Sequence, residues 1–84
     1  MPKVTMYFKN GCPYCVRASA LLSEKGVKVD KIEAESNHEI RERMRELSGR
    51  NTFPQIFIDD KHIGGCDDLF ALDQRGALDP LLEA

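Results

Sequence analysis

The sequence predicts a small α/β domain with a four-stranded mixed sheet flanked by about three helices, in the order β-α-β-α-β-β-α. Three observations lead to this fold class. Apolar and polar residues alternate along residues 4–8, as in a half-buried strand. Ile40, Met44 and Leu47 recur at helical spacing. An apolar run over residues 56–58 leads into a turn, as in a hairpin.

The first half of the chain has the pattern of a β-α-β unit. Asn10-Gly11 ends the first strand, and Cys12-Pro13 starts a helix, because proline suits the first helical position. Gly26 fits the C-terminal cap of that helix. A second strand is expected over residues 27–33, parallel to the first and reached by a right-handed crossover.

The middle of the chain predicts a second helix followed by a hairpin. Ser36 and Glu39 have the spacing of a capping box, which marks a helix start, and Gly49 ends this helix. Strands are expected over Gln55–Asp59 and Lys61–Gly64, joined at the tight Asp59-Asp60 turn.

The C-terminal part predicts a third helix and a last helical turn. Asp67 can cap the third helix, with Leu69 and Leu72 facing the core. Leucines within residues 78–82 indicate a final turn that docks on the core. No linker or repeat interrupts the chain, so we expect residues 1–84 to form a single domain.

Composition excludes several classes of function. The net charge of −2 argues against a general nucleic-acid binder. No apolar run approaches the ~18–20 residues needed to span a membrane, and no secretory signal is visible at the N-terminus. We therefore expect a cytoplasmic monomer that binds neither nucleic acid nor membranes.

The cysteines indicate redox chemistry. An odd count of three is poor evidence for a structural disulfide framework. Cys12 and Cys15 lie on one face of a helix start, where free N–H groups and the helix dipole stabilise an anion. Lys9 and Arg17 add positive charge, which favours a Cys12 thiolate, the nucleophile of disulfide exchange. Cys15, one turn inside, should be less exposed and suited to resolving a mixed disulfide.

A zinc site is the alternative reading of a Cys-x-x-Cys pair, since four-ligand sites need further partners. The remaining candidates are Cys66, His38 and His62, none at familiar zinc spacing. We therefore expect no metal, both histidines at the surface, and Met44 in the core.

Three segments resemble the dithiol (class I) glutaredoxins. Cys12-Pro13-Tyr14-Cys15 after a first strand resembles their active site. Thr52-Phe53-Pro54 resembles their Thr-Val-Pro loop, and the segment over residues 64–68 resembles their Gly-Gly-Cys/Ser-Asp-Asp motif. The resemblance covers the whole chain in order and spacing and is closest to small bacterial glutaredoxins. It implies the minimal thioredoxin fold, with glutathione as co-substrate and no permanently bound cofactor.

The resemblance also implies a glutathione site. Pro54 would be a cis proline that leaves the backbone of Phe53 free to pair with an extended peptide. Helix-start N–H groups would bind the γ-glutamyl carboxylate, and Asp67 would bind the α-amino group. Lys9 and Arg41 would bind the glycine carboxylate. The residues assigned to glutathione are Lys9, Tyr14, Arg41, Thr52, Phe53, Pro54, Gly65, Cys66 and Asp67.

Other roles stay open for several of these residues. Lys9 and Arg41 could be solvated surface charges, and Asp67 could serve only as a helix cap. Cys66 is expected to contribute its backbone rather than an oxidisable thiol. Phe53 replaces the usual valine. Arg41 stands where relatives often carry glutamine, so glutathione affinity should be more sensitive to salt.

The expected function is reduction of protein–glutathione mixed disulfides and protein disulfides, with Cys12 as nucleophile and Cys15 as resolving thiol. The expected partners are glutathione and glutathionylated or disulfide-containing proteins, with ribonucleotide reductase a candidate. Three alternatives stay open: a reductant fed by a flavoprotein reductase, an iron–sulfur carrier, and a pure glutathione-binding module. Cys-Gly-Phe-Ser relatives carry clusters, and Pro13, Tyr14 and Cys15 disfavour that role here.

Overall fold

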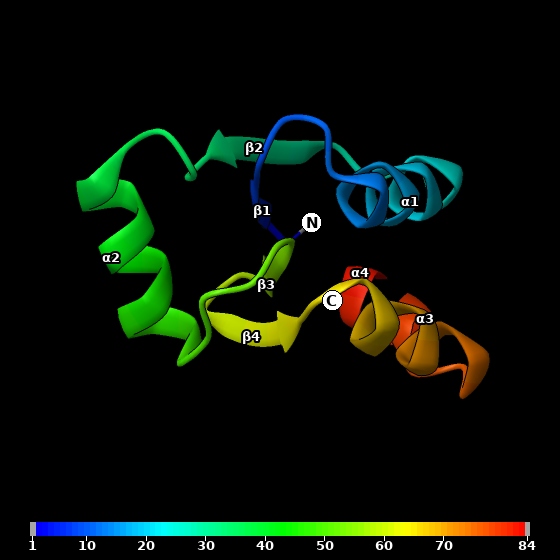
Figure 1. Ribbon diagram of the computed structural model, residues 1–84. Helices are drawn as coiled ribbons and strands as arrows, with labels where there is room; N and C mark the ends of the chain where they lie inside the picture. The colour runs from blue at the N-terminus through cyan, green and yellow to red at the C-terminus, as the bar shows by residue number, and fades with distance from the viewer. Residues whose placement is uncertain (1, 84) are drawn as a thin grey trace.

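The computed structural model describes residues 2–83 and shows a four-stranded sheet with helices on both faces (Figure 1). The strands are β1 (Val4–Phe8), β2 (Val29–Glu33), β3 (Gln55–Ile58) and β4 (Lys61–Gly64). The helices are α1 (Pro13–Glu24), α2 (His38–Ser48), α3 (Cys66–Gln74) and α4 (Leu78–Glu83). The expected fold class is confirmed, and the predicted final helical turn is a fourth helix.

The sheet has the order β2-β1-β3-β4, so β1 is a central strand. β1 runs parallel to β2 and antiparallel to β3, and β4 returns antiparallel to β3. The loop that leads to Cys12 therefore leaves the sheet from the end of a strand that is hydrogen-bonded on both sides. This fixes where α1 begins.

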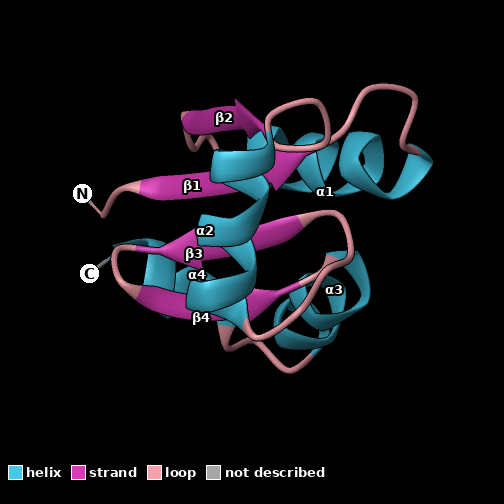
Figure 2. Ribbon diagram, turned by 60° about the vertical axis from the view of Figure 1, so that its left-hand side comes forward, coloured by secondary structure: helices cyan, strands magenta, loops and turns pink. Residues whose placement is uncertain are grey.

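The helices divide unequally between the two faces of the sheet. α1, α3 and α4 lie on one face, and α2 lies alone on the other (Figures 1 and 2). The larger core lies under the three helices and includes Met6, Leu22, Ile56, Leu69 and Leu78. The smaller core lies under α2 and consists of Tyr7, Ala34, Met44 and Phe57.

The exit of α1 explains why β2 starts later than the sequence predicts. Gly26 has φ +75°, in the left-handed region that favours glycine. The N–H of Gly26 donates to Ser23 at 3.0 Å and that of Val27 to Leu22 at 3.1 Å, the two bonds of a Schellman motif. Val27 therefore closes the helix, and β2 begins at Val29 rather than at the predicted residue 27.

The start of α2 also differs from the prediction. The cap is Asn37, whose side-chain oxygen accepts from the Ile40 N–H at 3.1 Å. The predicted cap, Ser36, is wrong because the Glu33 carboxylate binds both its N–H and its hydroxyl. Gly49 ends the helix in the left-handed region, as predicted.

The third helix begins one residue before the predicted cap. α3 starts at Cys66, and Gly65 is the residue at its N-cap. The carboxylate of Asp68, not that of Asp67, reaches back and accepts from the Gly65 N–H at 3.0 Å. The cap expected at Asp67 is therefore wrong. This leaves the Asp67 carboxylate exposed at the first turn.

The C-terminal leucines dock as expected. Leu78 and Leu82 of α4 are buried in the larger core. The strand expected over Gln55–Asp59 ends at Ile58, and Asp59, with φ +53°, belongs to the turn predicted at Asp59-Asp60. Every helix within residues 2–83 falls short of the length and apolar character that a membrane crossing requires.

Met44 is the one buried residue of α2 and should hold this helix on the sheet. We predict that Met44→Ala lowers the free energy of unfolding by about 2–4 kcal/mol, the usual cost of truncating a core side chain. Leu47→Ala is the matched control, because Leu47 lies on the same helix but is 49% exposed, and it should cost far less. Urea unfolding of both variants tests this, and equal losses would contradict it.

Candidate active site

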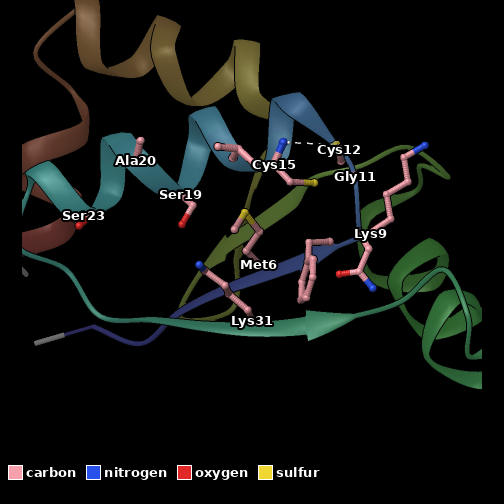
Figure 3. A pocket seen from close by; sticks show the side chains of 12 residues that line it. Met6, Lys9, Gly11, Cys12, Cys15, Ser19, Ala20, Ser23 and Lys31 are labelled. Carbon is pink, nitrogen blue, oxygen red and sulfur yellow. Dashed lines mark hydrogen bonds between the residues drawn. The ribbon is translucent and has the colours of Figure 1, made fainter.

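Cys12 and Cys15 lie at the start of α1, just after the loop that follows β1. Cys12 is the N-cap of the helix, and Pro13 occupies the first helical position. The backbone N–H of Cys15 donates to Cys12 Sγ at 3.3 Å, drawn as a dashed line in Figure 3. The sulfur of Cys12 thus takes the place that a capping oxygen takes in other helices, where an N–H group and the helix dipole favour negative charge.

The burial of the two cysteines differs from the expectation. Both thiols are free, and both residues are buried, Cys12 being 4% and Cys15 5% exposed. The prediction that Cys15 is less exposed than Cys12 is therefore wrong. Cys12 is equally buried because its side chain turns back over the first turn of α1 to reach the Cys15 N–H.

The environment of Cys15 keeps it protonated. Burial, followed by interaction with the Cys12 sulfur, raises the pKa of Cys15 to about 12. Cys15 is therefore a neutral thiol near pH 7. The two sulfurs, one turn apart, differ in their contacts, because the Cys12 sulfur accepts a backbone N–H at the helix N-terminus.

The ring of Phe53 has two cations close to it, which come from different parts of the chain. Lys9 Nζ lies 5.8 Å from the centre of its ring, and Arg41 Cζ lies 5.9 Å from it. Arg41 Nε also donates to Asn51 Oδ1 at 3.0 Å, and Lys9 Nζ lies 4.0 Å from Glu35. The structure therefore brings together Lys9 and Arg41, the two cations assigned to a carboxylate.

The loop that contains Pro54 packs against the start of α3. The Phe53–Pro54 peptide bond is cis, which confirms the expectation drawn from the resemblance. A Cβ atom added to Gly65 would lie 3.4 Å from the Pro54 carbonyl oxygen, so the two segments are in close contact. Thr52, Phe53, Pro54 and Gly65 thus adjoin one another.

Cys66 lies in the larger core at the first turn of α3. Burial raises the pKa of its thiol. Both observations agree with the expectation that Cys66 acts as a small apolar residue. Arg17, expected to add charge near Cys12, lies over the ring of Phe70, with its Cζ 5.7 Å from the ring centre.

An ion pair that sequence reasoning missed fixes the start of α3. Arg50 donates to the Asp68 carboxylate at 2.8 Å, and the same carboxylate accepts from the Gly65 N–H. These two contacts lower the pKa of Asp68. Arg50 follows α2 and Asp68 lies in α3, so local sequence patterns carry no signal of this contact.

A second missed network holds Thr52. Gln55 is fully buried, and its Nε2 donates to the Thr52 carbonyl and hydroxyl oxygens at 3.1 and 3.0 Å. Gln55 Oε1 lies 2.7 Å from His62 Nε2 and accepts a hydrogen bond from it. His62, expected at the surface, is instead partly buried, and burial followed by the charge of Arg50 lowers its pKa. The signal in the sequence that could have indicated this network is a glutamine at the first position of an otherwise apolar strand.

Two candidates stand apart from these contacts. Tyr14 is 53% exposed beside the cysteines, at the rim of the site. His38 is exposed, as expected. In the part of the chain that the structure describes, no three His, Cys, Asp or Glu side chains are grouped so as to hold a metal ion.

The chain is similar to known proteins in both sequence and fold. The family model described as Glutaredoxin matches residues 4–63. Glutaredoxin 3 of Escherichia coli strain K12 is 59% identical over 83 residues, which cover 99% of this chain and all of that protein.

Two solved structures extend the similarity to three dimensions. The solution structure of glutaredoxin from Brucella melitensis has a TM-score of 0.86 and 56% identity, covering 98% of this chain and 89% of that one. The crystal structure of a buckwheat glutaredoxin–glutathione complex has a TM-score of 0.88 and 30% identity, covering 98% and 77%. With its paired cysteines at the start of α1, the chain belongs to the glutaredoxin family of thiol–disulfide oxidoreductases.

Proposed function

We propose that this protein uses glutathione to reduce protein–glutathione mixed disulfides and protein disulfides, with Cys12 as nucleophile and Cys15 as resolving thiol. The observation that carries the proposal is the Cys15 N–H directed at Cys12 Sγ at the N-terminus of α1. A thiolate is the attacking species in disulfide exchange, and this position favours a thiolate.

The mixed-disulfide cycle needs Cys12 alone. The Cys12 thiolate attacks the glutathione sulfur, a Cys12–glutathione disulfide forms, and the protein sulfur leaves as a thiolate that takes a proton from water. A second glutathione thiolate then attacks the bound glutathione sulfur. Oxidised glutathione leaves, and Cys12 returns as a thiolate.

Reduction of a protein disulfide needs both cysteines. Cys12 attacks one protein sulfur and releases the other as a thiolate. Cys15 then loses its proton and attacks Cys12 Sγ, which frees the second protein thiolate and forms a Cys12–Cys15 disulfide. Ionisation of Cys15 becomes easier at this stage, because a disulfide-bonded Cys12 carries no charge to oppose it. Two glutathione molecules reduce the intramolecular disulfide.

The proposed glutathione site runs from Phe53 to the first turn of α3. The backbone of Phe53 pairs with the extended tripeptide, beside Thr52 and Pro54. The N–H groups of Cys66 and Asp67 receive the γ-glutamyl carboxylate, since the Gly65 N–H is already bound by Asp68. The exposed Asp67 carboxylate receives the α-amino group.

The other end of glutathione lies between the two cations. Lys9 and Arg41, both close to the ring of Phe53, bind the glycine carboxylate, and Tyr14 covers the sulfur from the rim. The buckwheat glutaredoxin that shares this fold was crystallised with glutathione, which supports glutathione as the ligand here.

The proposed setting is the cytoplasm, with the protein acting as a monomer on glutathionylated or disulfide-containing proteins. Ribonucleotide reductase is one candidate for such a partner. Recycling of the oxidised glutathione falls to a separate reductase.

We predict that the cysteine variants separate the two reactions. Cys12→Ser should lose turnover of a glutathionylated peptide, whereas Cys15→Ser should retain or exceed wild-type turnover, because Cys15 takes no part in that cycle. Cys15→Ser should lose reduction of a protein disulfide. The measurement is glutathione-dependent turnover of each substrate. Turnover of the glutathionylated peptide by Cys12→Ser would overturn the proposal.

We predict that Arg41→Gln raises KM for a glutathionylated peptide about threefold, the scale of an exposed ion pair, and leaves kcat nearly unchanged. The variant should also show a weaker dependence of KM on salt than wild type, because one charge contact is gone. Arg43→Gln is the matched control, since Arg43 lies on the same helix and is exposed on a different surface. Equal effects in both variants would contradict this assignment.

A further inference from the structure

A cavity of about 490 Å³ opens beside the two cysteines, between α1 and the β1–β2 side of the sheet (Figure 3). Cys12 and Cys15 line one end of it, and Ser19 and Lys31 lie farther along it. Of the residues proposed to hold glutathione, all of which the structure describes, Lys9 alone lines this cavity. The cavity is therefore a second surface at the reactive sulfur, distinct from the proposed glutathione site.

Lys31 is an exposed residue of the edge strand β2. β2 pairs Lys31 with Met6 of β1, and Met6 belongs to the core under α1. Paired residues of neighbouring strands point to the same face of a sheet, so Lys31 also points to the α1 face. Figure 3 shows its side chain reaching from β2 toward α1, on the side of Ser19.

The charge of Lys31 is unbalanced within the cavity. The residues that line the cavity include no aspartate or glutamate. Across residues 2–83, the ion pairs of the structure leave Lys31 without a carboxylate partner. Lys9 also lines the cavity, but its amine lies over Phe53 and near Glu35. Lys31 therefore supplies the unpaired positive charge.

The mouth of the cavity also has an apolar edge. Val16, one residue after Cys15, is 68% exposed and lines the cavity. An apolar side chain on a bound segment can pack against Val16 while an anionic side chain reaches Lys31. Both features fit a polypeptide better than a small thiol.

We propose that this cavity receives the segment of a glutathionylated protein that flanks its reacting cysteine, and that Lys31 selects for an acidic side chain in that segment. The inference rests on the proposed function. Glutathione there occupies the Phe53 side of Cys12, which leaves this cavity free for the protein half of the disulfide. The exchange reaction is unchanged, and the segment leaves with the protein thiolate.

The test compares glutathionylated peptides that carry Asp or Asn at each of the three positions on either side of the modified cysteine. At the position where the effect is largest, the kcat/KM of wild type should be about threefold to fivefold higher for the Asp peptide than for the Asn peptide. This is the range of an exposed ion pair. Lys31→Gln should abolish this preference, and Lys31→Glu should reverse it. High salt should weaken the wild-type preference.

Two controls separate this proposal from the proposed function. Lys28→Glu changes the net charge as Lys31→Glu does, but Lys28 is exposed outside the cavity, so the preference for Asp should persist. The mixed disulfide of glutathione with 2-mercaptoethanol has no flanking segment, so every variant should reduce it at the wild-type rate.

The outcomes are distinct. Absence of the Asp preference in wild type, its survival in Lys31→Gln, or its equal loss in Lys28→Glu would overturn the role of Lys31 while leaving glutathione-dependent reduction intact. If wild type reduces neither the peptides nor the small mixed disulfide with glutathione, the proposed function fails, and this inference fails with it.

Discussion

The chemistry proposed here depends on the hydrogen bond from the Cys15 N–H to Cys12 Sγ. It makes Cys12 the cap of α1, so the reactive sulfur is held by the helix that it begins. β1 fixes the position of this helix, because β1 is hydrogen-bonded on both sides and ends just before the loop. In the same turn, burial and the Cys12 sulfur raise the pKa of Cys15 to about 12, so that its thiol stays protonated near pH 7. In the proposed mechanism, one turn of helix thus holds both the nucleophile Cys12 and the neutral resolving thiol Cys15.

The proposed glutathione site depends on two polar networks behind it. Gln55, fully buried, binds Thr52 on one side and His62 on the other, and so holds the loop that leads to Pro54. Asp68 binds the Gly65 N–H and Arg50, and so holds the start of α3. A buried amide left without these partners would be costly. These contacts pre-organise both sides of the site before a ligand arrives.

Local patterns in the sequence predicted the fold well where a single segment contains the signal. The bounds of β4, the proline at the start of α1 and the glycine after α2 needed no information from elsewhere in the chain. The predicted caps of α2 and α3 were wrong because two neighbouring polar residues compete for each role, and a contact with a further residue decides between them. The Glu33 carboxylate binds Ser36, and Arg50 orients Asp68. The partners Arg50 and Asp68 are 18 residues apart, beyond the reach of any local pattern.

Site-resolved alkylation across pH tests the central claim most directly. Wild-type protein is treated briefly with iodoacetamide from neutral to strongly alkaline pH, and the initial rate at each cysteine is measured by mass spectrometry. We predict that Cys12 reacts at neutral pH, whereas the rate at Cys15 rises only as the pH approaches its pKa of about 12. Reaction of Cys15 at neutral pH as fast as Cys12 would contradict the unequal roles of the two sulfurs.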